Sequence, residues 1–311
     1  METSVDREVA LAIVRQAYAK QTMCLADVVD PRIGAAFAEV RREDFLGPGP
    51  WQMLRAPGLY SPTPEADPVY VYIDRAMGLV PERNINNGQP SLHAMLLKAA
   101  GIKEGEHVVH VGAGTGYYSA IMSVLAGPNG TVTAIECNPE LAARARSCLA
   151  GISNTRLLEG NGASAHFGTA NVIYVNAGVT HPADAWLDNL AEGGRLLLPL
   201  STDENMPSAG PAPPGGAASA SFKKAWFDPR KAMRTGAYFL IRRTKGTFDA
   251  RKLLPMAIIP AEGVRTEAAE AALAAAFERD DGSSVTHLIR GKSVPDEKCW
   301  LPGEGWCLTS D

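Results

Sequence analysis

The sequence predicts an α/β protein with a Rossmann-like sheet covered by helices on both faces, an N-terminal helical cap and a C-terminal extension. Residues 90–200 alternate between helical and strand-like patterns, which is typical of a parallel sheet. Residues 107–120 have the pattern of a strand, a tight turn with three glycines and the start of a helix. A second strand, 130–136, ends in an acidic residue, as in sheets that bind a nucleotide at the carboxyl ends of their strands.

The pattern along the chain separates a cap from a core. Residues 1–83 are expected to form the cap, with apolar stripes of helical period before position 50. The later part of the cap is rich in proline and glycine and contains an expected strand at 69–73. Residues 84–202 are expected to form the core, with strands at 107–111, 131–135, 155–158, 171–175 and 194–198.

The remainder of the chain is expected to extend this core. Residues 203–220 are rich in alanine, glycine, proline and serine and predict a flexible insertion, because they bury too little apolar surface to offset chain entropy. Residues 221–265 are expected to hold the closing strands of the sheet, 236–244 and 253–259. Residues 266–311 are expected to form the C-terminal extension, with a helix over 267–277 and a strand over 285–289.

The glycine turn indicates which ligand the sheet binds. Gly112, Gly114 and Gly116 are spaced two apart, whereas dinucleotide sites favour a third glycine one position later. Glycines remove Cβ atoms where a ligand lies against the backbone, and the helix that follows offers free amide groups. Glu136 stands where a carboxylate takes the two ribose hydroxyls. This compact spacing is typical of enzymes that use S-adenosylmethionine (SAM), so we predict that SAM binds here; a structural turn without a ligand is the alternative.

Five segments carry a broader pattern, and they lie at residues 85–94, 103–108, 112–116, 160–162 and 192–199. In order and spacing they resemble the protein-L-isoaspartate O-methyltransferase family, and residues 41–45 resemble the segment that ends the first helical unit of that family. The resemblance covers about the middle half of the chain strongly. It implies a Rossmann-like fold, SAM as the cofactor and a carboxylate of a peptide or protein as the methyl acceptor.

The resemblance also assigns candidate site residues. Three residues that replace the family's Thr-Ile-Ser are expected to form the catalytic acceptor loop: Asn86, Asn87 and Gly88. Asparagine amides can donate to a carboxylate, and the glycine is expected to make room where a serine side chain would stand. The residues expected to bind the cofactor are Gln89, His93, Gly112, Ala113, Gly114, Thr115, Gly116, Tyr117, Glu136, Cys137, Gly160, Asn161, Gly162 and Asn176.

Several of these residues have a structural alternative that the sequence leaves open. His93 is equally well explained as a satisfied histidine of the core, and Tyr117 either lines the pocket or simply packs. Asn161 stands in place of the family's aspartate near the adenine amino group, and its amide oxygen can still accept that hydrogen bond. The segment 160–162 is otherwise a surface turn. His110 is expected to be a structural residue of a buried strand.

Composition and cysteine usage favour a cytoplasmic enzyme. The net charge of −4 gives no electrostatic reason to expect a nucleic acid or an anionic membrane as partner. No apolar run reaches the roughly 18 residues of a membrane helix, and no secretory signal is evident. The five cysteines have no CxxC spacing and are expected to be reduced thiols without a metal, although Cys299 and Cys307 could be neighbours across a turn. The oligomeric state stays open.

The chemistry of methyl transfer favours a carboxylate acceptor. A carboxylate is already ionised at neutral pH and needs no general base, whereas an amine or phenol would need one nearby. We therefore expect a SAM-dependent O-methyltransferase that acts on an isoaspartyl or aspartyl peptide or protein. Two alternatives stay open, namely a divergent methyltransferase of a small molecule or another nucleophile, and a SAM-binding module without catalysis.

Overall fold

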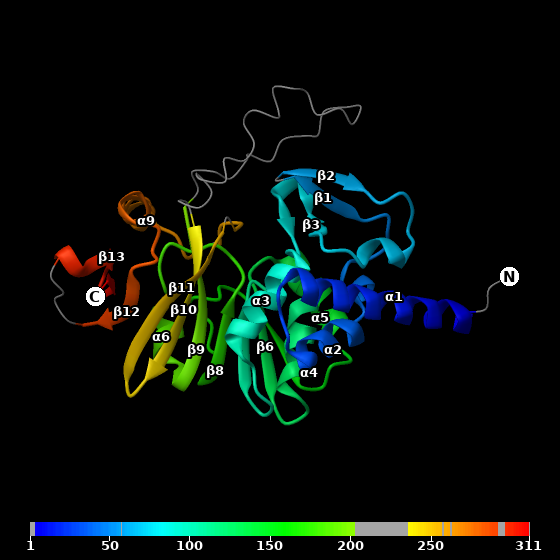
Figure 1. The fold of residues 1–311 in the computed structure, drawn as a ribbon, viewed down its shortest axis with the longest axis horizontal. Coiled ribbons are helices and arrows are strands. Elements are labelled where there is room, and N and C mark those ends of the chain that lie inside the picture. Colours follow the sequence, from blue (N-terminus) through cyan, green and yellow to red (C-terminus); the bar gives the residue numbers. More distant parts are fainter. Residues whose placement is uncertain are drawn as a thin grey trace, which may run out of the picture. The chain divides into compact units, whose positions relative to one another are not determined.

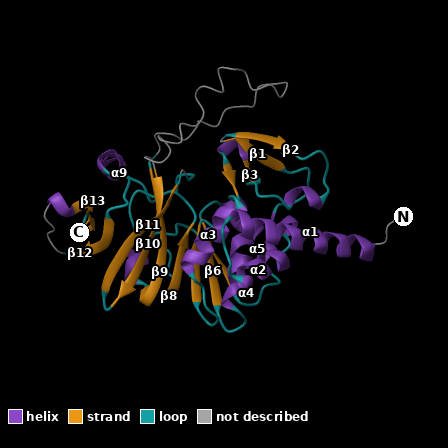
Figure 2. Ribbon diagram, viewed as in Figure 1, coloured by secondary structure: helices purple, strands orange, loops and turns teal. Residues whose placement is uncertain are grey.

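The computed structural model describes residues 4–56, 58–202, 236–256, 258–261, 263–291 and 296–310. The chain splits into two compact units, and Figures 1 and 2 show the elements of each. Among the described residues, the first unit comprises 4–106 and 113–159, and the second comprises 107–112, 160–202 and 236–310. The insertion predicted at 203–220 lies outside the described residues.

Helices dominate the first unit. They are α1 (Ser4–Leu25), α2 (Pro31–Glu39), α3 (Pro90–Ala100), α4 (Tyr117–Ala126) and α5 (Pro139–Leu149), with 3-10 turns η1 (Arg42–Phe45), η2 (Pro68–Val71) and η3 (Pro81–Arg83). Two antiparallel strand pairs and one parallel pair accompany them. These are β1 (Gln52–Ala56) with β2 (Leu59–Pro62), β3 (Gly78–Val80) with β4 (Ile85–Asn86), and β6 (Thr131–Glu136) with β7 (Thr155–Glu159).

The helix starts in the first unit follow from local sequence. The side chain of Asp30 accepts a hydrogen bond from the amide of Arg32 at 2.9 Å, and Pro31 opens α2. Asn138 caps α5 in the same way, and Pro139 again takes the first helical position. A short polar cap followed by proline satisfies a free amide and presets the helical φ angle, so both helices begin where the sequence places this pair.

A cluster of aromatic rings forms much of the core of the first unit. Tyr18 of α1 packs on Phe37 of α2, with ring centroids 6.1 Å apart. Tyr117 of α4 packs edge-on against Phe37 and against Phe45 of η1, at 6.5 and 5.7 Å. Such edge-to-face geometry is the favoured arrangement of buried aromatic pairs. The cluster therefore joins the N-terminal helices to the helix that follows the glycine turn.

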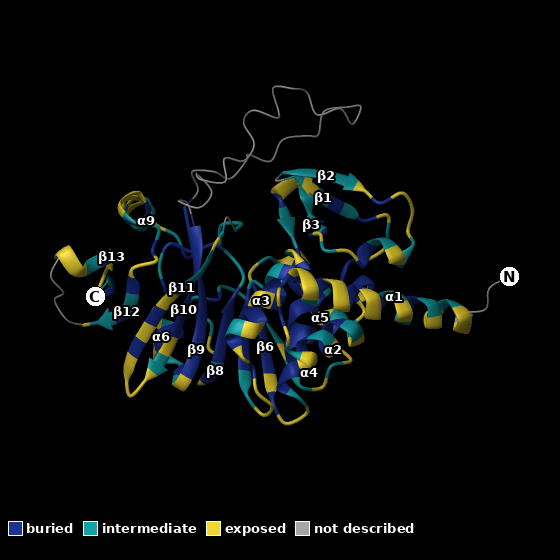
Figure 3. Cartoon of the chain, in the orientation of Figure 1, coloured by how far each residue is buried: buried dark blue, intermediate teal, exposed yellow. Residues whose placement is uncertain are grey.

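A mixed sheet forms the centre of the second unit. Its strand order is β13-β14-β12-β11-β10-β9-β8-β5. Strands β5 (His107–Val111), β8 (Ala170–Val175) and β9 (Leu190–Ser201) run parallel, and all later neighbours pair antiparallel: β10 (Gly236–Thr244), β11 (Thr247–Pro255), β12 (Val285–Arg290), β13 (Cys299–Gly303) and β14 (Trp306–Ser310). The helical segments are α6 (Asp184–Asp188), α9 (Glu267–Arg279) and η4 (Asp296–Lys298). Strands β8, β9 and β10 are buried along most of their length (Figure 3).

The predicted α/β class is confirmed, and most of the expected elements are present. Strands β5 and β10 have the predicted bounds, and the other core strands contain the predicted ranges. The helix expected over 267–277 lies within α9, and the strand expected over 285–289 lies within β12. None of the helices in the described ranges is both long and apolar enough to cross a membrane.

Two expected strands are wrong in position or type. Residues 69–73 are not a strand, because Asp67 accepts from the Val69 amide at 2.9 Å and Pro68 opens the 3-10 turn η2. The second closing strand, expected at 253–259, is β11 and begins at Thr247. Lys245 and Gly246 both have positive φ angles, and this two-residue turn sends the chain straight back along β10.

The expectation of reduced thiols throughout is also wrong. Cys299 and Cys307 form a disulfide, and their Cα atoms lie 6.0 Å apart. They stand on the two strands of the β13–β14 hairpin, which brings sequence neighbours across a turn into contact. Cys24, Cys137 and Cys148 are not part of a disulfide.

Candidate active site

The three glycines of the turn after β5 have left-handed backbone conformations. The φ angles are +76° at Gly112, +59° at Gly114 and +96° at Gly116, a region that residues with a Cβ rarely adopt. A Cβ on Gly116 would also lie 2.9 Å from the side chain of Leu149, and one on Gly114 would lie 3.0 Å from Leu79. Both backbone angle and space therefore require glycine in this loop.

Glu136 draws the glycine loop onto the end of β6. Its Oε2 accepts a hydrogen bond from the amide of Gly114 at 2.7 Å, and its Oε1 accepts from the amide of Asn138 at 2.9 Å. Cys137 is exposed, and its thiol lies 3.8 Å from Oε1. Burial raises the pKa of the Glu136 carboxyl, and the bonds from the Asn138 and Gly114 amides partly oppose that rise. Each carboxylate oxygen keeps a further lone pair for a ligand hydroxyl.

The remaining residues of the loop are buried. The Ala113 amide donates to the carbonyl of Ile135 at 3.1 Å and so holds the loop against β6. Thr115 is buried, and its hydroxyl has no hydrogen-bond partner among the described residues. Tyr117 lies in the aromatic cluster, where its hydroxyl is 3.3 Å from that of Tyr18. The structure thus shows a packing role for Tyr117, and a role in cofactor binding stays a prediction.

The predicted acceptor loop follows β4. Asn86 is half-buried; its Nδ2 donates to the hydroxyl of Tyr60 at 2.9 Å, and its Oδ1 accepts from the amide of Gly88 at 2.9 Å. Asn87 is buried, and its Oδ1 accepts from the Met77 amide at 2.8 Å and from Arg42 at 3.3 Å. The Asn87 Nδ2 atom is buried without a hydrogen-bond partner in the described part of the chain. Asn87 therefore anchors the loop, and Asn86 is the more accessible amide.

Gly88 and His93 meet at the start of α3. The φ angle of Gly88 is +76°, and the His93 ring stands where a Cβ would project. His93 is buried and stacks on Tyr118, with ring centroids 3.5 Å apart and ring planes 14° apart. The Tyr118 hydroxyl donates to the carbonyl of Gly88 at 3.4 Å. The expected room for a serine side chain at position 88 is therefore occupied by the imidazole.

Asp74 holds the other end of the acceptor loop, and sequence reasoning did not single it out. Its carboxylate accepts from the Ser91 amide at 2.7 Å, from the Ser91 hydroxyl at 2.8 Å and from Gln89 Nε2 at 2.8 Å. Gln89 is exposed and precedes the first residue of α3. Nothing in the local pattern around Asp74 distinguishes it, since its partners lie some 15 positions away.

The other predicted cofactor residues lie in the second unit. Asn161 accepts from the Ala163 amide at 2.9 Å and donates to the Gly263 carbonyl at 3.2 Å, so both ends of its amide are engaged. Gly160 has a φ of +141° and open space around it, whereas a Cβ on the buried Gly162 would collide with Val111. Asn176 is half-buried directly after β8. The role of each in binding stays a prediction.

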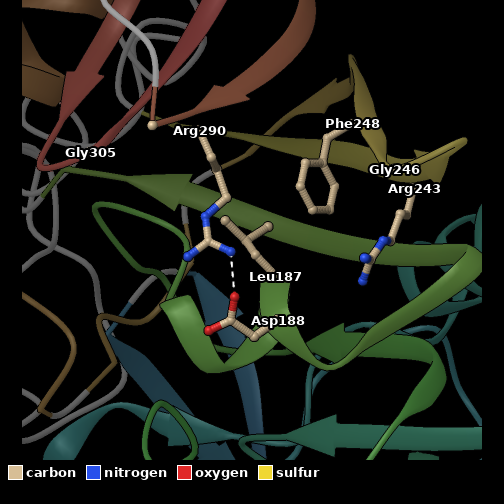
Figure 4. Close-up of a pocket in the computed structure, with 8 residues that line it drawn as sticks. Leu187, Asp188, Arg243, Gly246, Phe248, Arg290 and Gly305 are labelled. Carbon is tan, nitrogen blue, oxygen red and sulfur yellow. Dashed lines mark hydrogen bonds and ion pairs between the residues drawn. The ribbon is translucent and has the colours of Figure 1, made fainter.

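A cavity of about 490 Å³ also lies in the second unit (Figure 4). It is lined by Leu187, Asp188, Arg243, Gly246, Phe248, Arg290, Gly291 and Gly305. Arg290 forms ion pairs with Asp188 and, at 2.7 Å, with Asp184. None of the predicted site residues lines it. No group of three metal-ligating side chains is found in the described ranges.

Comparison with known proteins gives one consistent family. A family model for protein-L-isoaspartate(D-aspartate) O-methyltransferase matches residues 60–208. A protein-L-isoaspartate O-methyltransferase of Thermotoga maritima is 30% identical over 179 residues, which are 56% of this chain and 51% of that protein. Protein-L-isoaspartate O-methyltransferase 1 of Rhodopseudomonas palustris is 30% identical over 204 residues, which are 64% of this chain and 74% of that protein. The chain thus spans about half the length of the Thermotoga relative.

A solved structure shares the fold. It is a protein-L-isoaspartate O-methyltransferase from Plasmodium falciparum in complex with S-adenosyl-L-homocysteine. The TM-score is 0.57 and the identity 16%, and the match covers 79% of this chain and 97% of the other. At this identity the likeness shows a common fold.

Proposed function

Because the chain belongs to the protein-L-isoaspartate O-methyltransferase family, we propose that it transfers a methyl group from SAM to a carboxylate of a peptide or protein. The acceptor is an isoaspartyl or aspartyl side chain. The activity and its substrate are both part of the proposal, because the chain matches only part of its relatives' length. For the methyl donor, SAM, the proposal rests on the 2.7 Å hydrogen bond between the Gly114 amide and Glu136.

The residues around that bond fit the proposed cofactor. The left-handed glycines leave bare backbone, the Glu136 carboxylate can accept from ribose hydroxyls, and the buried Thr115 hydroxyl has no partner in the described part of the chain. When bound, SAM supplies a methyl group already activated by a sulfonium charge. We propose that Ala113–Tyr117, Glu136 and Cys137 hold it. Gln89, His93, Gly112, Gly160, Asn161, Gly162 and Asn176 stay predicted partners.

The acceptor loop supports a carboxylate as the nucleophile. Residues 86–88 carry two amides and no ionisable side chain, so they can bind an anion but cannot remove a proton. A carboxylate needs no such base, because it is ionised at neutral pH. The loop would orient the acceptor oxygen, and orientation alone removes about 7–11 kcal/mol of barrier in favourable cases. Asn86 and the backbone at Gly88 are the groups we propose to contact the acceptor.

The proposed cytoplasmic location has a direct test in the Cys299–Cys307 pair. Disulfides are rare in the cytosol and common in oxidising compartments. Alkylation of the protein at the moment of cell lysis, followed by mass spectrometry, counts the free thiols. Five alkylated cysteines would mean that the 299–307 disulfide is reduced inside the cell and would support the cytoplasmic proposal. Three alkylated cysteines with an intact 299–307 disulfide would oppose it.

A labelling assay tests the proposed function. The protein is incubated with methyl-labelled SAM and either an isoaspartyl peptide or its aspartyl isomer. We expect label that is released by mild base, as a methyl ester is, and that appears on one isomer in preference to the other. Base-stable label would assign a different nucleophile, and label on a small-molecule extract alone would assign the alternative methyltransferase. SAM binding without transfer to any of these acceptors would leave a non-catalytic module.

A further inference from the structure

A cation lies completely buried beneath the acceptor loop. Arg42 of η1 has no exposed surface, and its guanidinium points at the backbone of residues 71–75. We infer, on the basis of the proposed function, that Arg42 is a positioning residue for methyl transfer. It shapes the 71–75 segment and holds Asn87, and in this way fixes the acceptor loop at 86–88 relative to α3.

The contacts of Arg42 are unusually concentrated on one stretch of backbone. Nη1 donates to the carbonyls of Val71 and Ile73 at 2.7 and 2.8 Å, and Nη2 donates to the carbonyl of Arg75 at 2.7 Å. Three carbonyls from five consecutive residues therefore turn inward onto one planar group. Only a guanidinium offers several donors in a fixed fork of this kind, whereas a lysine ammonium would offer its donors from a single point.

This cation makes no direct ion pair with a carboxylate of the described residues, and Asp74 attracts it only from a distance. Its guanidinium faces three backbone carbonyls and the rings of Tyr18 and Tyr117, whose centroids lie 5.9 and 5.7 Å away. Taking a charge out of water costs free energy, and an apolar side chain of similar volume is often the more stable choice. The burial of Arg42 is therefore better explained by the conformation that it imposes than by a gain in stability.

That conformation reaches the acceptor loop by two routes. Arg42 Nη2 donates to Asn87 Oδ1 at 3.3 Å, and Asn87 also exchanges hydrogen bonds with the backbone of Met77 at 2.8 and 3.0 Å. The second route runs through Asp74, which lies inside the segment held by Arg42 and binds the amide and hydroxyl of Ser91 in the first turn of α3. The acceptor loop at 86–88 is thus held on one side by Asn87 and on the other by the start of α3, and both contacts depend on the way residues 71–75 wrap around Arg42.

The test compares Arg42→Lys with Arg195→Lys. Arg195 is also buried, but it lies in the second unit, so its variant controls for the loss of any buried guanidinium. A small misplacement of an acceptor can cost roughly 100-fold in rate, and we expect a loss of this order in kcat/KM for the isoaspartyl peptide with Arg42→Lys only. The dissociation constant of S-adenosylhomocysteine should stay within about threefold of the wild-type value, since the glycine loop at 112–116 keeps its contacts.

A rescue experiment separates positioning from folding. Methylguanidine added at millimolar concentration to Arg42→Ala should restore part of the turnover, and the same addition should leave Arg195→Ala unchanged. Equal kcat/KM in wild type and Arg42→Lys would overturn the inference. A loss of affinity for S-adenosylhomocysteine as large as the loss of turnover would also overturn it. The defect would then affect the cofactor site as well as the acceptor loop.

Hydrogen exchange keeps this test independent of the substrate. The amides of Met77 and Ser91 should exchange faster in Arg42→Lys than in wild type, and the Gly114 amide should not change. If wild type methylates no isoaspartyl peptide but these amides respond, the proposed function fails and the role of Arg42 in shaping the loop stands. If wild type is active and the amides do not respond, the role of Arg42 fails and the function stands.

Discussion

The imidazole of His93 occupies the space into which a side chain on Gly88 would project. A Cβ at position 88 would lie 2.9 Å from His93 Cδ2 and closer still to Nε2, and the backbone there has a φ of +76°. His93 cannot easily retreat, because it stacks on Tyr118, whose hydroxyl in turn donates to Gly88. The two positions are therefore coupled, and glycine at 88 is a condition of histidine at 93 in this conformation.

Replacing Gly88 by serine should consequently damage the fold rather than restore a lost hydroxyl. We expect Gly88→Ser to lower the free energy of unfolding by about 1–3 kcal/mol, through backbone strain and overpacking against His93. Denaturant unfolding measures this. Gly105→Ser is the matched control, since Gly105 also has a positive φ but has no atom within 4 Å of its Cβ position.

A double mutant tests the coupling between positions 88 and 93. If the imidazole is the obstacle, the double mutant Gly88→Ser/His93→Ala should lose less free energy of unfolding than the two single mutants lose in sum. A loss for Gly88→Ser no greater than for Gly105→Ser would mean that His93 moves aside freely.

Glu136 should contribute directly to the affinity for S-adenosylhomocysteine. We expect Glu136→Ala to weaken binding by about 1–3 kcal/mol, the range of hydrogen bonds to a charged group. Isothermal calorimetry measures the change. Glu140→Ala provides the control, because Glu140 is an exposed carboxylate of the following helix. An equal loss of affinity in Glu136→Ala and Glu140→Ala would contradict the proposed cofactor site. Tight binding of NAD without binding of S-adenosylhomocysteine would contradict it too.

The same carboxyl should make cofactor affinity depend on pH. Burial raises the pKa of Glu136 above its ordinary value of 4.5. The ionised form is the better acceptor of ribose hydroxyls, so affinity should be full at neutral pH and fall as the pH drops through the raised pKa. Glu136→Gln should remove this dependence, because an amide does not titrate. The same pH dependence of affinity in wild type and Glu136→Gln would show that the Glu136 carboxylate does not touch the ligand.

Stability in acid should depend on His110. Complete burial in β5 lowers the pKa of this histidine from 6.5 to about 3, so the folded protein holds it neutral. The unfolded chain binds a proton below pH 6.5 and the folded chain does not, so stability is full above that pH and is lost as the pH falls toward 3. We expect a loss of about 2 kcal/mol on going from about pH 7.5 to about pH 5.

Denaturant unfolding at the two pH values checks this expectation. The pH-dependent loss should be absent in His110→Leu and retained in His166→Leu, since His166 is exposed. The same pH dependence in wild type and His110→Leu would assign the acid sensitivity to other groups.

The sequence predicts best where local pattern alone decides the structure. The apolar run at β5 and the glycine turn after it follow from local propensity, and both lie where they were expected. Local pattern fails at 69–73, where β-branched and aromatic residues favour a strand but Asp67 and Pro68 impose a turn. Local pattern also gives no sign of the role of Arg42. Its partners are backbone carbonyls about thirty positions away, and a backbone carbonyl leaves no trace in the residue types. The Gly88–His93 coupling was hidden for a related reason, because it depends on the φ angle of one residue.

The most direct test of the account is the Michaelis constant of an isoaspartyl peptide with Asn86→Asp. The change keeps the shape of the side chain but places a negative charge where we propose that a carboxylate binds. We expect KM to rise at least about tenfold through like-charge repulsion. Affinity for S-adenosylhomocysteine should be unchanged, and the exposed control Gln21→Glu should behave as wild type. An unchanged or lower KM in Asn86→Asp would contradict the claim that this loop receives a carboxylate.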